Sequence, residues 1–349
     1  MRTFTNPFLK PPYIIAVSLL WFCTVVCHAA ERHLWDEGWR FALHPDDAPL
    51  QPDFKDDAWR LLDLPHDWAI EGDFYAQNPS GANGGALPGG IGWYRKHLAL
   101  HDNDTASRYV LHFDGAYMNT SVYVNGTLLG TRPYGFISFS YDITPHLNKQ
   151  GDNVVAVKVD NSRQPNSRWY TGCGVYRHVY LSKSTDVRVA EWGVQAISEV
   201  KKGVGHVTLN TQIENFSGRS RRVTVRQKLW NKTLQLVTQA SKVCDIAVSG
   251  TTVKQQMRVP KPQLWSPASP YLYTITTEII ENGRVLDGDT LTMGMRTVAF
   301  DAKQGFFLNG KNMKINGVCL HGDLGCLGAA INEDALYRQV SMMKAMGAN

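Results

Sequence analysis

The stretch Val122-Tyr123-Val124-Asn125-Gly126 indicates the end of a β-strand followed by a tight turn. Its two valines alternate with a tyrosine, so one face of the strand is apolar. Asn-Gly is the dipeptide that most strongly favours a two-residue type I′ hairpin turn. The same alternation recurs on both sides of it, in Tyr109, Leu111 and Phe113 and in Val155, Val157 and Val159. Because no helical period lasts beyond a turn or two, residues 31–186 are predicted to form an all-β sandwich.

A second β-rich region is expected over residues 187–299. Apolar and polar residues alternate again, in Val207, Leu209 and Ile213 and in Tyr273, Ile275 and Ile279. Asn282-Gly283 provides a further hairpin turn. The strand spacing fits an immunoglobulin-like sandwich, although the sequence lacks the Cys…Trp…Cys signature of antibody domains. Prolines on both sides of Leu264-Trp265 predict an irregular crossing at a sheet edge.

Residues 300–349 change in character. A strand is predicted over residues 314–320, followed by a glycine-rich loop. Asn332 is a suitable N-cap for a helix that carries Glu333 and Asp334 in its first turn and ends near Gly347. One β/α unit cannot bury both of its faces, so it is expected to begin a larger α/β body. Poor burial is therefore predicted for Ile315, Val318, Leu336, Val340 and Met343.

The composition limits the class of protein. The chain has 349 residues, 43% of them hydrophobic and 11% aromatic, which predicts a globular, strand-rich protein of more than one domain. Its formal net charge of +5 is spread thinly, without a clustered basic face. We therefore predict no nucleic-acid partner.

The first thirty residues have the order of a secretory signal. Arg2 and Lys10 precede an apolar run, and small residues follow at Ala29 and Ala30. The run is shorter than the roughly 20 residues that span a membrane, which disfavours a membrane anchor. We expect residues 1–30 to be a signal peptide and the protein to be periplasmic or extracellular. Cys27 is a weaker candidate for lipid attachment.

Four cysteines lie beyond that segment, at positions 173, 244, 319 and 326. They are too few and too scattered for a disulfide scaffold, and we expect buried free thiols. A zinc site built from Cys319, His321, Asp323 and Cys326 is disfavoured, because the spacing matches no usual zinc pattern. No metal site and no cofactor are therefore predicted within this chain.

Four stretches, at residues 64–68, 87–96, 168–177 and 307–321, together resemble glycoside hydrolase family 2. The loop Pro-Gly-Gly-Ile-Gly-Trp-Tyr-Arg-Lys at residues 88–96 is most similar to the β-galactosidase branch. The resemblance implies a jelly-roll sugar-binding domain over residues 31–186 and an immunoglobulin-like domain over residues 187–299. It implies that residues 300–349 are the start of a (β/α)₈ catalytic barrel, truncated at Asn349.

The resemblance also suggests substrate-binding residues. His321 matches a family histidine that donates a hydrogen bond to a sugar hydroxyl, and Asp323 shares its side if the strand continues. A carboxylate near Asp160 and Asn161 reaches the active-site rim in the family. Trp169 is a candidate for stacking on a sugar ring, although a buried sandwich tryptophan remains open. Gly322 stands where the family often has another hydrogen-bonding side chain, which removes one substrate contact.

Retaining glycosidases need two carboxyl groups about 5–5.5 Å apart. By resemblance both are glutamates of later barrel strands, expected beyond Asn349, so no catalytic residue is assigned here and Glu333 is explained by the helix dipole. The chain is predicted to be the inactive N-terminal part of an exported β-galactosidase that binds β-galactosides. A β-glucuronidase, a β-mannosidase and a non-catalytic carbohydrate-binding scaffold remain alternatives. A homo-oligomer and a divalent or monovalent cation in the barrel also remain open.

Overall fold

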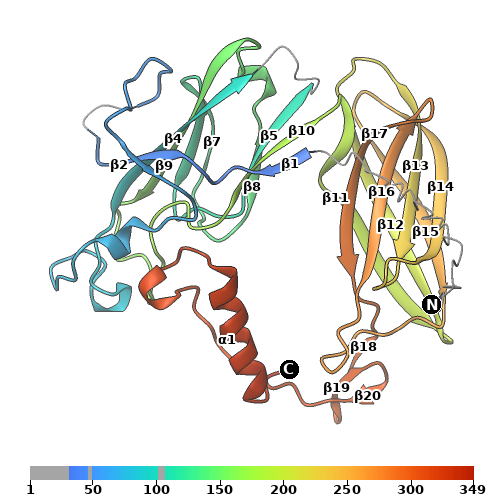
Figure 1. Ribbon diagram of the computed structural model, residues 1–349. Helices are drawn as coiled ribbons and strands as arrows, with labels where there is room; N and C mark the ends of the chain where they lie inside the picture. The colour runs from blue at the N-terminus through green and yellow to red at the C-terminus, as the bar shows by residue number, and fades with distance from the viewer. Residues whose placement is uncertain (1–30, 46–48, 101–106) are drawn as a thin grey trace, which may run out of the picture.

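The computed structural model describes residues 31–45, 49–100 and 107–349. The proposed signal peptide lies outside these residues. The described part is mainly β, as the sequence predicts, and forms two sandwiches with a C-terminal segment below them (Figure 1). None of its helices is long and apolar enough to cross a membrane.

The first sandwich pairs a six-stranded sheet with a four-stranded sheet. The six-stranded sheet has the order β3 (Arg60–Leu62), β2 (Trp39–Leu43), β4 (Gly90–Leu100), β9 (Gly151–Asn161), β6 (Thr120–Val124) and β7 (Thr127–Arg132). The four-stranded sheet has the order β1 (Glu31–Leu34), β10 (Val179–Ser184), β5 (Arg108–Phe113) and β8 (Phe139–Asp142). The hairpin predicted at Asn125-Gly126 joins β6 to β7, and both turn residues have positive φ, as a type I′ turn requires.

The core of this sandwich is rich in aromatic side chains. Trp39, Phe41, Tyr94 and Phe113 are buried between the two sheets among valines and leucines. Short 3₁₀ helices lie in its loops: η1 (Trp68–Glu71), η2 (Ala82–Gly84) and η3 (Thr144–His146). The loop that carries η1 and the loop between β9 and β10 lie at the end of the sandwich nearest the C-terminal segment (Figure 1).

The second sandwich has a more uniformly aliphatic core. Its three-stranded sheet has the order β11 (Val187–Lys201), β12 (Val204–Asn215) and β15 (Thr251–Pro260). Its four-stranded sheet has the order β14 (Leu236–Ile246), β13 (Arg221–Trp230), β16 (Tyr273–Glu281) and β17 (Arg284–Met293). The alternating residues predicted to face inward, including Val207, Leu209, Ile213, Ile275 and Ile279, are buried.

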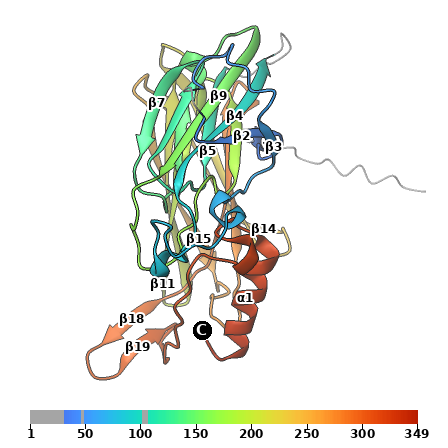
Figure 2. The same cartoon turned by 90° about the vertical axis from the view of Figure 1, so that its left-hand side faces the viewer.

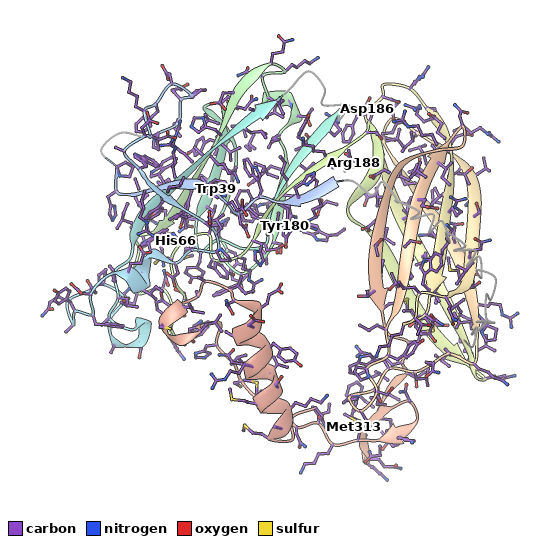
Figure 3. All side chains as sticks on the ribbon, viewed as in Figure 1. Trp39, His66, Tyr180, Asp186, Arg188 and Met313 are labelled. Carbon is purple, nitrogen blue, oxygen red and sulfur yellow. The ribbon has the colours of Figure 1, made fainter. Side chains whose placement is uncertain are left out.

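The two sandwiches meet where the chain passes from β10 into β11. Arg108 of the first sandwich lies over the ring of Phe216 of the second, 3.6 Å from its centroid. His112 on β5 faces Glu191 on β11, with 3.2 Å between Nδ1 and Oε1. Figure 3 shows Asp186 and Arg188 in this junction, on the side away from the C-terminal segment.

The C-terminal segment contains a small antiparallel sheet and one helix. The sheet consists of β18 (Val298–Asp301), β19 (Gly305–Leu308) and β20 (Lys311–Asn312). Another 3₁₀ helix, η4 (Gly325–Leu327), precedes α1 (Glu333–Ala345). Figure 2 shows the β18–β19 hairpin and α1 as separate projections below the sandwiches. The predicted N-cap is confirmed, because Asn332 Oδ1 accepts a hydrogen bond from Ala335 N at 2.9 Å.

The strand predicted over residues 314–320 is wrong for this structure. Strand structure ends at Asn312, and residues 314–320 form an exposed coil. A strand needs a neighbour to hydrogen-bond its backbone, and none of the described strands lies beside this segment. Alternation therefore cannot place Cys319, His321 and Asp323 on one face.

The prediction of poor burial is confirmed. Ile315, Val318 and Val340 are exposed, and Leu336 and Met343 are half-buried.

Candidate functional site

Two predicted site residues lie beside each other although they are far apart in sequence. The ring centroids of Trp169 and His321 are 5.4 Å apart, with 36° between the ring planes. Trp169 belongs to the loop between β9 and β10 and is 40% exposed, so the alternative of a buried core tryptophan is wrong. His321 belongs to the coil that precedes η4. Two exposed rings with polar N–H groups are available to a ligand here.

Both rings line a hollow of about 400 Å³ between the first sandwich and the C-terminal segment. One wall comes from the sandwich, with Phe136, Tyr170, Thr171, Tyr176 and Arg177. The other wall comes from Leu320, Gly322, Leu324, Ala329, Ile331 and Leu336. Aromatic faces together with a few polar groups suit a sugar, which has apolar C–H faces and hydroxyl edges.

The described residues that line this hollow include no aspartate or glutamate. Glycoside hydrolysis with retention requires two carboxyl groups close to the scissile bond. The hollow offers aromatic faces and polar edges to a ligand, whereas the carboxyl pair for hydrolysis is not among its described lining residues.

Asp67 joins the two walls. It is 2% exposed, and its carboxylate accepts four hydrogen bonds. Ala69 N and Cys173 N donate to Oδ1 at 3.1 and 2.8 Å. The Tyr170 hydroxyl and Ala329 N, the latter at 2.8 Å, donate to Oδ2. Three segments of the chain thus meet at one side chain.

Burial raises the pKa of Asp67, and the four hydrogen bonds offset only part of that rise. The pKa of Tyr170 is also raised, first by its own burial and then by the Asp67 charge. Tyr170 therefore keeps its proton at neutral pH and remains the donor in this pair.

A second polar network supports the loop that carries Asp67. His66 Nδ1 lies 2.8 Å from the Tyr94 hydroxyl, and its Nε2 lies 3.2 Å from Glu71 Oε1. Arg60 donates to the same Glu71 carboxylate. Burial lowers the pKa of His66, although Glu71 acts in the opposite direction. Figure 3 shows His66 at the end of the sandwich that the C-terminal segment approaches.

The other predicted site residues lie outside the hollow. Asp160 closes a turn, since its Oδ1 accepts from Ser162 N and Oγ, and its Oδ2 lies 3.3 Å from Lys158 Nζ. Asn161 is buried and bonds to Gly172 O and to Asn166. Asp323 is half-buried and lies close enough to Tyr170 to raise its pKa. The structure therefore brings together Trp169 and His321, but not Asp160 and Asn161.

The cysteines differ from the sequence prediction. All four described cysteines are free, but only Cys173 is buried, and Cys319 and Cys326 are exposed. The expectation of burial failed for these two because their segment lacks a covering layer among the described residues. No three His, Cys, Asp or Glu side chains of the described chain gather as metal ligands.

Sequence reasoning missed Asp67, Tyr170 and Arg177 as residues at this site. In residues 64–68, Pro65 and Trp68 indicate a structural role for the whole stretch, including Asp67. Asp67 stands between His66 and Trp68 in an apolar stretch, and this was the available signal. A carboxylate in such a stretch is expected to be buried, and a buried charge needs hydrogen-bond partners.

Two all-β sandwiches, the first with an aromatic hollow at one end, define the fold class of the chain. Residues 187–296 match the family described as glycosyl hydrolases family 2. Residues 90–190 match its galactose-binding domain-like module. The chain belongs to glycosyl hydrolase family 2.

Several relatives cover most of this chain. A β-galactosidase of Bacteroides ovatus is 47% identical over 321 residues, which are 91% of this chain and 38% of that protein. A putative β-glucuronidase of Formosa agariphila is 35% identical and covers 96% of this chain with 32% of its own length. This chain therefore spans less than two fifths of either relative.

A solved structure shows the same arrangement. The crystal structure of a β-glycosidase from Bacteroides vulgatus matches with a TM-score of 0.86 at 36% identity. The match covers 91% of this chain and 41% of that one.

Proposed function

We propose that this chain supplies the sugar-binding sandwich and part of the substrate rim of an exported retaining glycosidase that acts on terminal β-galactosides. The observation that carries the proposal is the ring pair of Trp169 and His321 in one hollow. The 47% identity to a β-galactosidase supports the choice of sugar. In this proposal the two catalytic glutamates are supplied from outside residues 1–349, in a barrel that residues 300–349 begin.

Binding to the chain itself tests the rim. Methyl β-galactoside should bind in the millimolar range by calorimetry, since only one side of the site is built here. Trp169→Ala should weaken binding about fivefold, because ring stacking contributes about 1 kcal/mol. Trp192→Ala, which changes another exposed tryptophan that lies outside the hollow, is the control. Equal affinity in both variants would contradict the proposed rim.

Hydrolysis tests the proposed origin of the carboxylates. The 349-residue chain should not turn over a chromogenic β-galactoside, because the hollow lacks a carboxyl pair among its described residues. Clear turnover would show that the carboxylates lie within the chain. An open reading frame beyond codon 349 that encodes two barrel glutamates would support the proposal.

A β-glucuronidase is the second candidate, and Arg177 favours it. Its side chain lines the hollow, and a guanidinium binds a carboxylate such as that of glucuronic acid in bidentate fashion. Methyl β-glucuronide should then bind more tightly than the galactoside, with a preference that disappears in Arg177→Gln. A preference for the galactoside that Arg177→Gln leaves unchanged favours the first proposal.

A further inference from the structure

The contact between Asp67 and Ala329 crosses 262 positions of the chain. Among the described residues, it is one of two hydrogen bonds that attach residues 328–331 to the first sandwich; the other runs from Ile331 N to Tyr176 O at 2.9 Å. We call residues 328–331 the docked segment. Ala329 packs in a small buried cluster with Tyr117 and Tyr176.

Two glycines allow the close approach. Gly328 has φ +60°, and a Cβ there would lie 2.4 Å from Asp67 Oδ2 and 2.5 Å from Ile70 Cγ2. Gly172, on the sandwich side, would place a Cβ 2.4 Å from Ala329 Cβ. Both backbones therefore pass directly against the Asp67 carboxylate, and a side chain at either position would separate them.

The same carboxylate reaches both walls of the hollow. Tyr170, which donates to Oδ2, follows Trp169 in the chain, and Ala329, which donates to the same oxygen, lines the opposite wall with His321. Asp67 is itself buried and is not among the lining residues. Its effect on a ligand must therefore act through these two neighbours.

We propose that Asp67 is a positioning residue that fixes the docked segment to the loop of Trp169 and thereby holds His321 against the Trp169 ring. The positioning itself is independent of any ligand. Its consequence for sugar binding rests on the proposed function. Loss of the carboxylate should free the docked segment and separate the two rings while the sandwich stays folded.

The test is Asp67→Asn, with Asp36→Asn as the matched control. Asp36 is another buried carboxylate of this sandwich, which accepts from Val179 N at 2.8 Å and faces His178. The amide introduced by Asp67→Asn keeps the size of the side chain, but its NH₂ group cannot accept from Ala329 N. Hydrogen exchange at the Ala329 and Ile331 amides should become roughly tenfold faster in Asp67→Asn and stay unchanged in Asp36→Asn.

A spectroscopic readout follows the ring pair directly. The His321 ring protons, close to the Trp169 indole, should show a ring-current shift in NMR spectra that Asp67→Asn abolishes and Asp36→Asn retains. Unchanged exchange and an unchanged His321 shift in a folded Asp67→Asn protein would overturn the proposal.

A glycine pair tests the proposal if Asp67→Asn does not fold. Gly328→Ala should release the docked segment, because its Cβ meets Asp67. Gly325→Ala is the control, because Gly325 has a similar φ of +63° but open space around its Cβ position. Equal exchange rates at Ile331 in the two variants would overturn the proposal.

Calorimetry with methyl β-galactoside separates the two claims. Weaker binding in Asp67→Asn than in Asp36→Asn supports both of them. If the unmodified chain binds no galactoside but Asp67→Asn still releases the docked segment, the positioning role stands and the proposed function fails.

Discussion

The docked segment and residues 314–320 are close in sequence but differ in burial and in hydrogen bonding to the first sandwich. The docked segment gives two backbone amides to the first sandwich and places Ala329 in a buried cluster. Residues 314–320 contain Ile315, Val318 and Leu320, yet they are exposed throughout. The difference shows that apolar alternation does not create a strand by itself. The docked segment is attached to the first sandwich because the buried Asp67 carboxylate accepts a hydrogen bond from its backbone and Ala329 packs against apolar side chains there.

The largest expected contrast concerns thiol reactivity. Cys319 and Cys326 are exposed and should react with a thiol reagent in the folded protein. Cys173 is buried, and burial followed by the Asp67 charge raises its pKa to about 12. Because the thiolate is the reactive form, Cys173 should react only after unfolding, orders of magnitude more slowly. Mass spectrometry of the labelled peptides measures all three; prompt labelling of Cys173 would contradict the packing around Asp67.

Removing the hydroxyl group of a tyrosine compares the buried network around Asp67 with the exposed surface of α1. Tyr170→Phe removes a hydrogen bond to a buried carboxylate, which should cost about 1.5–3 kcal/mol of unfolding free energy. Tyr337→Phe on α1 changes a side chain that is 77% exposed and should cost less than about 0.5 kcal/mol. Urea denaturation of both variants gives the comparison. Equal costs would mean that the Tyr170 hydroxyl does not stabilise the site.

Two buried aspartates should respond to pH in opposite directions. Burial raises the pKa of Asp67 above 3.8, so the folded protein takes up this proton before the unfolded chain does. The contribution of Asp67 to stability should therefore increase as the pH falls from about 7 to about 4. Burial also acts to raise the pKa of Asp56, but the hydrogen bond and charge of Arg95, together with His97, lower it overall. Its contribution should be lost as the pH falls below 3.8.

Unfolding free energies of Asp67→Asn and Asp56→Asn across this range test both signs. Relative to Asp67→Asn, the unmodified protein should gain stability from about pH 7 to about pH 4. Relative to Asp56→Asn, it should lose stability below about pH 4. Parallel pH profiles for both variants would contradict the assignment.

The smallest expected effect is on the exposed face of α1. Val340 is 57% exposed, so Val340→Ser should change the unfolding free energy by less than about 0.5 kcal/mol. The helix should persist in circular dichroism, because Asn332 still caps it. A cost above about 2 kcal/mol would indicate that this face packs against something in solution.

Local sequence signals predicted much of the fold. Asn125-Gly126 and Asn282-Gly283 have the positive φ angles that their turns require, and Asn332 caps α1 as expected. These features depend on residues within a few positions of each other. The strand over residues 314–320 could not be judged in this way, because a strand forms only beside a pairing partner, and the sequence of the segment does not show whether one is present.

The candidate site was predictable only in part. The sequence indicated Trp169 and His321 as separate candidate residues, but it did not predict that their rings are in contact. Asp67 was missed because its role arises mainly from donors on two distant segments, the farther one 262 positions away. Asp160 and Asn161 were placed near the rim by resemblance, while their side chains bond to the loop that follows β9.

Magnetisation transfer from methyl β-galactoside to the protein tests whether the Trp169 and His321 rings form one sugar-binding surface. We expect intermolecular NOEs from the sugar C–H groups to both the Trp169 indole and the His321 ring, because these rings line one hollow. NOEs to other aromatic residues, with none to Trp169 or His321, would contradict it.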